Sequence, residues 1–335
     1  MKRALITGIT GQDGSYLAEL LLEKGYEVYG LIRRKSTDLY GNVEHLKNDI
    51  KFIYGDMTDI VSLMNAVTIS MPDEIYNLAA QSFVAVSFDQ PITTTNINAI
   101  GVVNLLEVIR TIKPDAKLYQ ASTSEMFGKV IVTPQNESTT FNPCSPYGVA
   151  KLYAHHMLVN YRNIYNLYAC SGILFNHESE RRGIEFVSRK ITDGVAKIAL
   201  HKQEYIELGN MDTMRDWGHA KDYVNAMWLM LQNEQPDDYV IATGTQHTVR
   251  EFVITAFKVA GIDISFSGSG LEEVGINTKT NEIVLKINPK FYRPLEVDTL
   301  CGDSSKAKET LKWNTDISFS DLVEKMVKSD MLLNK

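Results

Sequence analysis

The sequence has little of several features that would point to particular classes of protein. Three cysteines in 335 residues (Cys144, Cys170 and Cys301) are too few and too widely spaced for a disulfide framework or a metal cluster. The net charge of −7 gives the chain no general attraction to nucleic acid or to anionic membranes. No apolar run approaches the roughly 20 residues of a membrane span, and no apolar leader precedes the first expected strand. We therefore expect a cytoplasmic enzyme with no nucleic-acid partner, no membrane partner and no metal.

The N-terminal residues have the pattern of a strand, a glycine turn and a helix. Residues 4–7 are apolar, as in a buried strand, and residues 16–24 have helical periodicity. Between them lie Gly8, Gly11 and Gly14. Glycines let the backbone turn tightly and approach a pyrophosphate, and a helix N-terminus offers N–H groups and partial positive charge. We favour dinucleotide binding over a plain structural turn, and the GxxGxxG spacing resembles that of the short-chain dehydrogenase/reductase superfamily.

Strand-like and helix-like segments then alternate along the first half of the chain. This alternation with short connections predicts an α/β fold, a Rossmann-type doubly wound parallel sheet with ligands at the carboxyl ends of its strands. We expect residues 1–175, with returning segments near 215–245, to form a nucleotide-binding domain. The remainder of 176–335 is expected to form a smaller α/β substrate-binding domain, with a mobile glycine-rich loop at 268–279.

The residues after the second and third expected strands bear on the choice of cofactor. The second strand ends in Arg33, Arg34 and Ser36, where an acidic residue would favour NAD and cations favour a 2′-phosphate, so we expect NADP. The alternative is a solvated basic loop. After the third strand, Asp56 resembles the superfamily carboxylate that meets adenine, whereas Asp59 caps the following helix in the simpler interpretation.

A candidate catalytic stretch follows the fifth expected strand. It contains Thr123, Ser124 and Glu125, and Tyr147 and Lys151 come about 20 residues later. Residues i and i+4 share one face of a helix. A phenol with a reference pKa near 10 needs a nearby cation to act as a base at neutral pH, and Lys151 would supply it. The alternative for Tyr147 is a half-buried aromatic whose hydroxyl bonds to the backbone.

Longer stretches resemble the GDP-mannose 4,6-dehydratase family, in one register over nearly the whole chain. The similar segments are residues 7–19, 120–125, 145–155, 173–179, 215–224, 238–243 and 293–298. The sequence departs from the family pattern at Thr93, Cys144, Glu180 and Met214, where the family usually has tyrosine, arginine, proline and lysine. The departures at Cys144 and Met214 leave open the subunit contacts and details of the nucleotide site.

The resemblance implies a lyase that converts GDP-α-D-mannose to GDP-4-dehydro-6-deoxy-D-mannose and water, the first step towards GDP-fucose and other GDP-6-deoxyhexoses. It implies internal hydride transfer through tightly bound NADP. Tyr147 would take the C4 hydroxyl proton, Lys151 would lower the Tyr147 pKa, and Thr123 would hydrogen-bond the C4 oxygen. Glu125 would act at C5 and C6 as base and then acid. The simpler alternative for Glu125 is a first-turn carboxylate at a helix N-terminus.

The resemblance also implies two sets of binding residues and a homodimer or homotetramer. The expected NADP-binding residues are Gly8, Ile9, Thr10, Gly11, Gln12, Asp13, Gly14, Arg33, Arg34, Ser36, Asp56, Met57, Leu78, Ala79, Ala80, Gln81, Ser82, Thr93, Tyr147, Lys151, His177 and Arg182. The expected GDP-mannose-binding residues are Ser82, Thr123, Ser124, Glu125, Tyr147, Asn176, Lys190, Arg215, Arg293 and Glu296. A 4-epimerase or 4-keto-sugar reductase, and a non-catalytic NADP sensor on the same fold, remain the alternatives.

Overall fold

The main sheet of the protein has seven parallel strands. The computed structural model describes residues 1–36, 39–291 and 300–335. The strand order β10-β6-β5-β4-β1-β2-β3 reverses direction between β1 and β4, which in such sheets opens a crevice for ligands. This confirms the expected doubly wound sheet. The strands are β1 (Arg3–Thr7), β2 (Glu27–Ile32), β3 (Lys51–Tyr54), β4 (Glu74–Asn77), β5 (Lys117–Thr123), β6 (Ala169–Leu174) and β10 (Asp238–Ile241).

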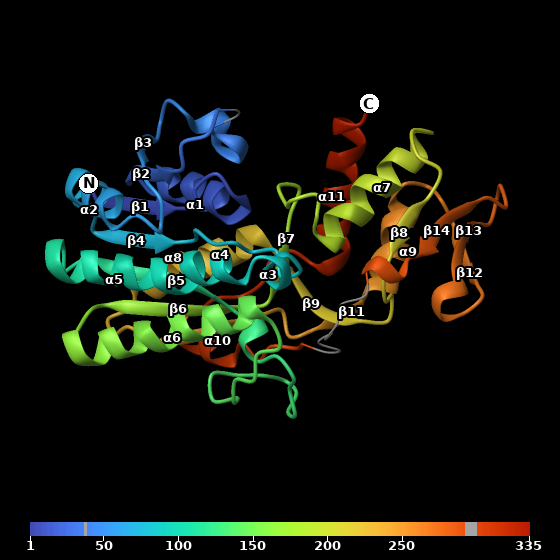
Figure 1. Ribbon diagram of the computed structural model, residues 1–335. Helices are drawn as coiled ribbons and strands as arrows, with labels where there is room; N and C mark the ends of the chain where they lie inside the picture. Colours follow the sequence, from blue (N-terminus) through green and yellow to red (C-terminus); the bar gives the residue numbers. More distant parts are fainter. Residues whose placement is uncertain (37–38, 292–299) are drawn as a thin grey trace.

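Helices cover both faces of this sheet (Figure 1). Alternate residues of β1 explain why both faces are apolar: Ala4 and Ile6 join the core under one set of helices, and Leu5 joins the core under the other. The first set is α1 (Gln12–Glu23), α8 (Ala220–Gln232) and α10 (Ser305–Leu311). The second is α2 (Ile60–Ser70), α5 (Gly101–Ile112) and α6 (Pro146–Tyr165).

One helical run is longer and more apolar than the sequence analysis allowed. It joins α4 (Pro91–Thr95), a π-helical turn (Asn96–Ile100) and α5, and is preceded by the short α3 (Val86–Asp89). Pro91–Ile112 spans 22 residues, and its most apolar 18-residue window has a mean hydropathy of 1.3, enough by length and composition to cross a membrane. The expectation that no apolar run reaches this length is therefore wrong. Half of its most apolar window is buried, and Leu105, Leu106 and Ile109 are completely buried against the sheet, so the run packs as a core helix.

The C-terminal part of the chain builds two smaller sheets beside the carboxyl ends of the main strands (Figure 1). A three-stranded sheet contains β7 (Asn176–Glu178), β9 (Met214–His219) and β11 (Gln246–Thr248), and a four-stranded sheet contains β8 (Ile206–Leu208), β12 (Ile264–Ser267), β13 (Val274–Asn277) and β14 (Ile283–Ile287). The helices α7 (Val187–Ala199), α9 (Val249–Val259) and α11 (Phe319–Leu333) pack around a core that includes Trp217 and Phe252. Within the described part of the chain, 3₁₀ turns form at Gly41–Leu46, Ser124–Met126, Gly270–Glu272 and Pro289–Phe291.

The glycine-rich segment 268–279 is not a loop along its whole length, and its mobility stays a prediction. It contains β13, which pairs antiparallel with β12 through Phe266 and Gly275. The β-branched residues flanking the glycines had the alternation of a strand. The division into two domains near residue 175 stays a prediction; β10, α8 and α10 pack with the main sheet although they come later in the chain.

Shortening a buried side chain of α5 should destabilise the protein if this helix is part of the core. We expect Leu105→Ala to lower the free energy of unfolding by about 2–5 kcal/mol, because it leaves a cavity beneath the helix. Urea denaturation followed by circular dichroism measures the change. Ile100→Ala is the matched control, since Ile100 is 44% exposed in the same run, and its cost should stay below about 1 kcal/mol. Equal losses in the two variants would contradict this packing.

Candidate active site

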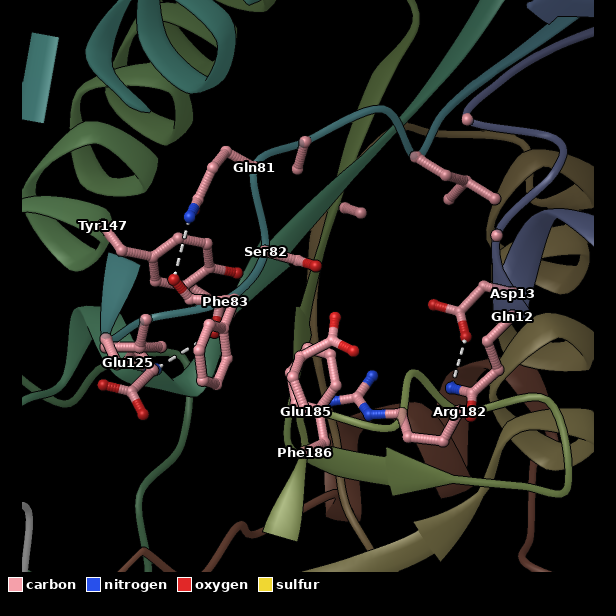
Figure 2. A pocket seen from close by; sticks show the side chains of 18 of the residues that line it. Gln12, Asp13, Gln81, Ser82, Phe83, Glu125, Tyr147, Arg182, Glu185 and Phe186 are labelled. Carbon is pink, nitrogen blue, oxygen red and sulfur yellow. Dashed lines mark hydrogen bonds between the residues drawn. The ribbon is translucent and has the colours of Figure 1, made fainter. Parts of the chain in front are cut away.

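A cavity of about 1080 Å³ opens at the carboxyl ends of the main strands. Its walls come from the glycine turn after β1, the segments after β2, β4 and β5, the start of α6, and the β7–α7 connection. Figure 2 shows Tyr147 and Glu125 on one wall, and Arg182 and Glu185 on the other. Nearly all expected site residues therefore meet in one place, although they are spread over more than 200 positions of the sequence.

The glycine turn has the geometry that a diphosphate needs. Gly8 has φ +68°, and a Cβ there would lie 2.8 Å from the Ala79 nitrogen. A Cβ on Gly14 would lie 2.5 Å from the Gly8 oxygen, so both positions require glycine. Gly11 is the N-cap of α1 and provides no side chain to its N–H groups. The start of α1 can thus bind an anion approaching from the cavity.

The segment after β4 forms the opposite side of the cofactor crevice. Thr7 Oγ1 accepts hydrogen bonds from the backbone of Leu78 and Ala79 at 3.1 and 3.0 Å. Asn98, on the π-helical turn, makes two hydrogen bonds to the backbone of Gln81. Its Oδ1 accepts from the Gln81 nitrogen at 2.9 Å, and its Nδ2 donates to the Gln81 carbonyl at 2.8 Å. Asn98 was missed by sequence reasoning, because only the fold brings it to this loop.

Most of the expected cofactor residues line the cavity, and three do not. Arg33 lines it together with Lys35, a neighbour that the sequence analysis did not select. Arg34 and Ser36 are among the described residues but are not part of the wall. Ile9 is completely buried, and its side chain fills the space beside Gly30.

Two aspartates after β3 have different roles in the structure. Asp56 lines the cavity, and its carboxylate accepts hydrogen bonds from the Thr58 backbone and hydroxyl at 2.9 and 2.7 Å. Asp59 caps α2 by accepting from the Val61 nitrogen at 3.0 Å, which confirms the capping interpretation. Also in the wall are Thr10, Gln12, Asp13, Met57, Ala80, Ser82 and Thr93.

The candidate catalytic groups come from β5 and α6. Ser145 caps α6 by accepting from the Gly148 nitrogen at 3.0 Å, and Pro146 occupies its first turn. This start places Tyr147 and Lys151 on the buried side of the helix, 8% and 4% exposed. Thr123 ends β5, and its Oγ1 accepts from the Glu125 nitrogen at 3.2 Å. Ser124 lines the same wall.

Burial dominates the ionisation of the phenol and the ammonium. It raises the pKa of Tyr147 to about 12, with the Thr123 hydrogen bond opposing this effect and the Glu125 charge adding to it. It lowers the pKa of Lys151 to about 8. Lys151 Nζ donates to the Ala121 carbonyl at 2.8 Å and lies 5.9 Å from the centre of the Tyr147 ring. Lys151 therefore does not bring the Tyr147 pKa below its ordinary value in the way that the resemblance implied.

The part of the cavity wall formed by β9, α7 and the segment between β7 and α7 carries cations. Arg215 is 7% exposed and lines the cavity. Lys190 Nζ lies 3.1 Å from the centre of the Phe291 ring, and burial lowers the pKa of Lys190 to about 8. Arg182 stacks over Phe186 at 3.6 Å, and its Nε lies 3.0 Å from Glu178.

Three further residues were expected to bind the substrate, and other residues of the wall were not expected at all. Asn176 lines the cavity, whereas Arg293 and Glu296 fall outside the described residues. Sequence reasoning missed Phe83, Glu185, Phe186, Asn210, Thr213 and Lys290, which also line the wall. In residues 1–36, 39–291 and 300–335 no group of three or more His, Cys, Asp or Glu side chains could hold a metal.

Comparison with known proteins matches this site to one family. The model of the family described as GDP-mannose 4,6 dehydratase matches residues 5–326. The chain belongs to the GDP-mannose 4,6-dehydratase family. A GDP-mannose 4,6 dehydratase of Drosophila melanogaster is 55% identical over 99% of this chain and 87% of its own length. That of Homo sapiens is 52% identical over 98% and 91%.

Solved structures agree with the fold. The dTDP-glucose 4,6-dehydratase of Bacillus anthracis, solved with NAD, superposes with a TM-score of 0.81 at 21% identity, covering 98% of this chain and 96% of that one. Glu180 stands where the family resemblance led us to expect proline. Its carboxylate accepts from the Tyr16 hydroxyl at 2.9 Å and lies 3.4 Å from His219 Nε2. Burial acts to raise the pKa of Glu180, but these partners lower it to about 2. Glu180 therefore adds a contact between α1 and the segment after β7.

Removing the Lys151 ammonium should change how stability depends on pH. The folded pKa of Lys151 lies below its ordinary value of 10.5, so the unfolded chain binds more protons and stability rises as the pH climbs from about 8 towards 10.5. We expect Lys151→Met to be more stable than the parent at pH 7, by up to about 3 kcal/mol, with the gap closing near pH 10.5. Urea titrations at pH 7 to 11 measure it. A gap that stays constant with pH would contradict the buried ammonium.

Proposed function

We propose that the protein is a GDP-mannose 4,6-dehydratase that works through bound NADP. It converts GDP-α-D-mannose into GDP-4-dehydro-6-deoxy-D-mannose and water. The observation that carries this proposal is that Thr123, Glu125, Tyr147 and Lys151 line one cavity with the glycine turn. A simple epimerase or reductase needs the phenol and the lysine but has no use for a carboxylate at the position of Glu125.

The residues of the cavity suit a nicotinamide dinucleotide. The uncapped start of α1 and the glycines at 8, 11 and 14 would hold the diphosphate. Arg33 and Lys35, at the end of β2, would face the adenosine ribose, where cations favour a 2′-phosphate. When bound, NADP supplies a reversible hydride acceptor and, in its oxidised form, a ring charge that favours the tyrosinate. These features support NADP over NAD.

The chain's own residues would handle the protons of the reaction. Tyr147 takes the proton of the C4 hydroxyl, and Thr123 hydrogen-bonds the C4 oxygen as it becomes a ketone. The ketone makes the C5 proton acidic, and Glu125 removes it. Glu125 then protonates the C6 hydroxyl, which leaves as water, and Tyr147 returns its proton to C5. The C4 hydroxyl proton thus ends on C5, and the C5 proton leaves in the water. The hydride removed from C4 would be returned to C6, so protons and electrons balance.

The cations on the far side of the cavity would bind the GDP moiety. Arg215 and Lys190 face the space beyond the catalytic wall, and guanidinium and ammonium groups suit a diphosphate. Asn176, at the start of β7, lines the same cavity and would reach the sugar nucleotide. The roles of Arg293 and Glu296 at the GDP ribose, and assembly as a homodimer or homotetramer, stay predictions.

Replacing the Glu125 carboxylate should stop the elimination without removing the cofactor. We expect Glu125→Gln to lower turnover of GDP-mannose by at least about 10³-fold, because an amide can neither accept the C5 proton nor donate one at C6. Mass spectrometry of the sugar nucleotide, which follows the 18-dalton loss of water, measures it. NADP affinity should change less than about threefold.

Glu185→Gln is the matched control, because Glu185 lines the same cavity from the opposite wall (Figure 2). It should keep most of the turnover. If the wild-type protein releases a product that retains the C6 hydroxyl, the dehydratase assignment is wrong; if Glu125→Gln keeps its turnover, only the role of Glu125 is wrong.

The preference for NADP should depend on Arg33. We expect Arg33→Ala to weaken NADP binding by about tenfold and NAD binding much less, because only NADP carries the 2′-phosphate. Fluorescence titration with the reduced cofactors measures both affinities. Arg34→Ala is the control from the same basic run, since Arg34 does not line the cavity, and it should leave both affinities nearly unchanged. Equal losses for NADP and NAD in Arg33→Ala would refute the 2′-phosphate contact.

A further inference from the structure

Both ring nitrogens of His177 face acceptors. Nδ1 lies 2.8 Å from the carbonyl oxygen of Phe175, and Nε2 lies 2.7 Å from Asp13 Oδ2. A carbonyl oxygen can only accept, so Nδ1 carries a proton. An ionised carboxylate can also only accept, so Nε2 carries a second proton whenever Asp13 is charged. The hydrogen bonds therefore require either the imidazolium form of His177 or a protonated Asp13.

The surroundings favour the ionised pair. Asp13 lies in the first turn of α1, where the helix dipole favours negative charge, and its Oδ1 accepts from Gln12 Nε2 at 3.0 Å. Burial acts to raise the pKa of Asp13, but the charge and hydrogen bond of His177 outweigh it and lower this pKa. Burial acts to lower the pKa of His177, but Asp13 outweighs it and raises this pKa.

The other groups packed against His177 do not reverse this balance. Arg182 opposes the imidazolium charge, but it lies beside Glu178. From α8, the neutral Tyr223 ring stacks on His177 with centroids 4.6 Å apart and planes 18° apart. Burial keeps the pKa of Tyr223 well above its ordinary value, so Tyr223 carries no charge at neutral pH.

The same segment is tied to α1 by further hydrogen bonds. Gln12 Nε2 also donates to the His177 carbonyl at 3.0 Å, and Ser179 Oγ donates to Gln12 Oε1 at 2.8 Å. Gln12 and Asp13 begin the helix that faces the diphosphate end of the cavity, and β7 begins the segment that carries Asn176 and Arg182. A change in the pair would thus move both sides of the cofactor site.

We propose that Asp13 and His177 form a buried ion pair that positions the start of α1 against β7 and neutralises the Asp13 charge beside the cofactor phosphates. His177 acts through Asp13 and not by a ring hydrogen bond to the cofactor, because both of its nitrogens already have partners. Loss of the His177 proton leaves a bare carboxylate at the anion-binding helix terminus. Cofactor affinity then falls by about tenfold per pH unit above the pKa of His177. The link to NADP rests on the proposed function, whereas the charge of the pair does not.

The charge state can be measured in the full-length protein without cofactor. We expect nitrogen-15 NMR of the histidine rings to show both nitrogens of His177 protonated at pH 7.5, with deprotonation above its ordinary pKa of 6.5. In Asp13→Asn, His177 should lose its second proton at a pH at least one unit lower. A neutral His177 ring in the wild-type protein at pH 6.5 to 7.5 would overturn the proposal, and this readout needs neither a variant nor turnover.

The effect on the cofactor is tested by NADPH fluorescence titration between pH 6.5 and 9.5. We expect wild-type affinity to fall with rising pH, and that of Asp13→Asn to fall less steeply, because Lys151 still titrates within this range. Asp115→Asn is the control, because Asp115 pairs with Lys113, is 74% exposed and does not line the cavity; it should behave like the wild type. An equally steep fall in Asp13→Asn would overturn the link to cofactor binding. Absence of NADPH binding at every pH would instead overturn the proposed function.

Discussion

The structure of this site depends on the close approach of two backbone segments at the turn after β1. Gly8 lies so near the Ala79 nitrogen, and Gly14 so near the Gly8 oxygen, that a Cβ at either position would overlap backbone atoms. Backbone cannot move aside as a flexible side chain can. This contact sets the angle at which α1 leaves the sheet and therefore where its free N–H groups point. The other elements of the site take their positions relative to that helix terminus.

The second half of the chain is attached to the same helix. The segment of residues 176–182 meets α1 through Asp13, Gln12, Tyr16 and Glu19, by way of ionic and neutral hydrogen bonds. The cofactor end and the substrate end of the cavity are thus coupled at α1 and do not form two separate sites. Such a coupling suits a reaction in which the sugar stays bound between two redox steps, because both ligands must keep one geometry throughout.

The part of the cavity wall formed by β5 and α6 holds two ionisable side chains whose charged forms are unfavourable. Tyr147 and Lys151 are nearly completely buried, and burial makes the phenolate and the ammonium both unfavourable. Groups of this kind respond strongly to any charge that enters the cavity, because little water is present to screen it. We therefore expect a charged ligand to shift these pKa values strongly; among the chain's own side chains, Thr123 already opposes the rise of the Tyr147 pKa.

The sequence by itself determined the parallel sheet, the glycine turn and the catalytic residue types. The patterns that specify them are local, as in β2, β3 and α2, each of which contains its own run of apolar residues. Only the tertiary structure decided that Lys35 and not Arg34 faces the cavity, because adjacent side chains leave the backbone in different directions. It also decided that Asn98 holds the Gln81 loop and that Asp13 meets His177, 164 residues away. Such contacts arise from the packing of whole elements, and no local pattern encodes them.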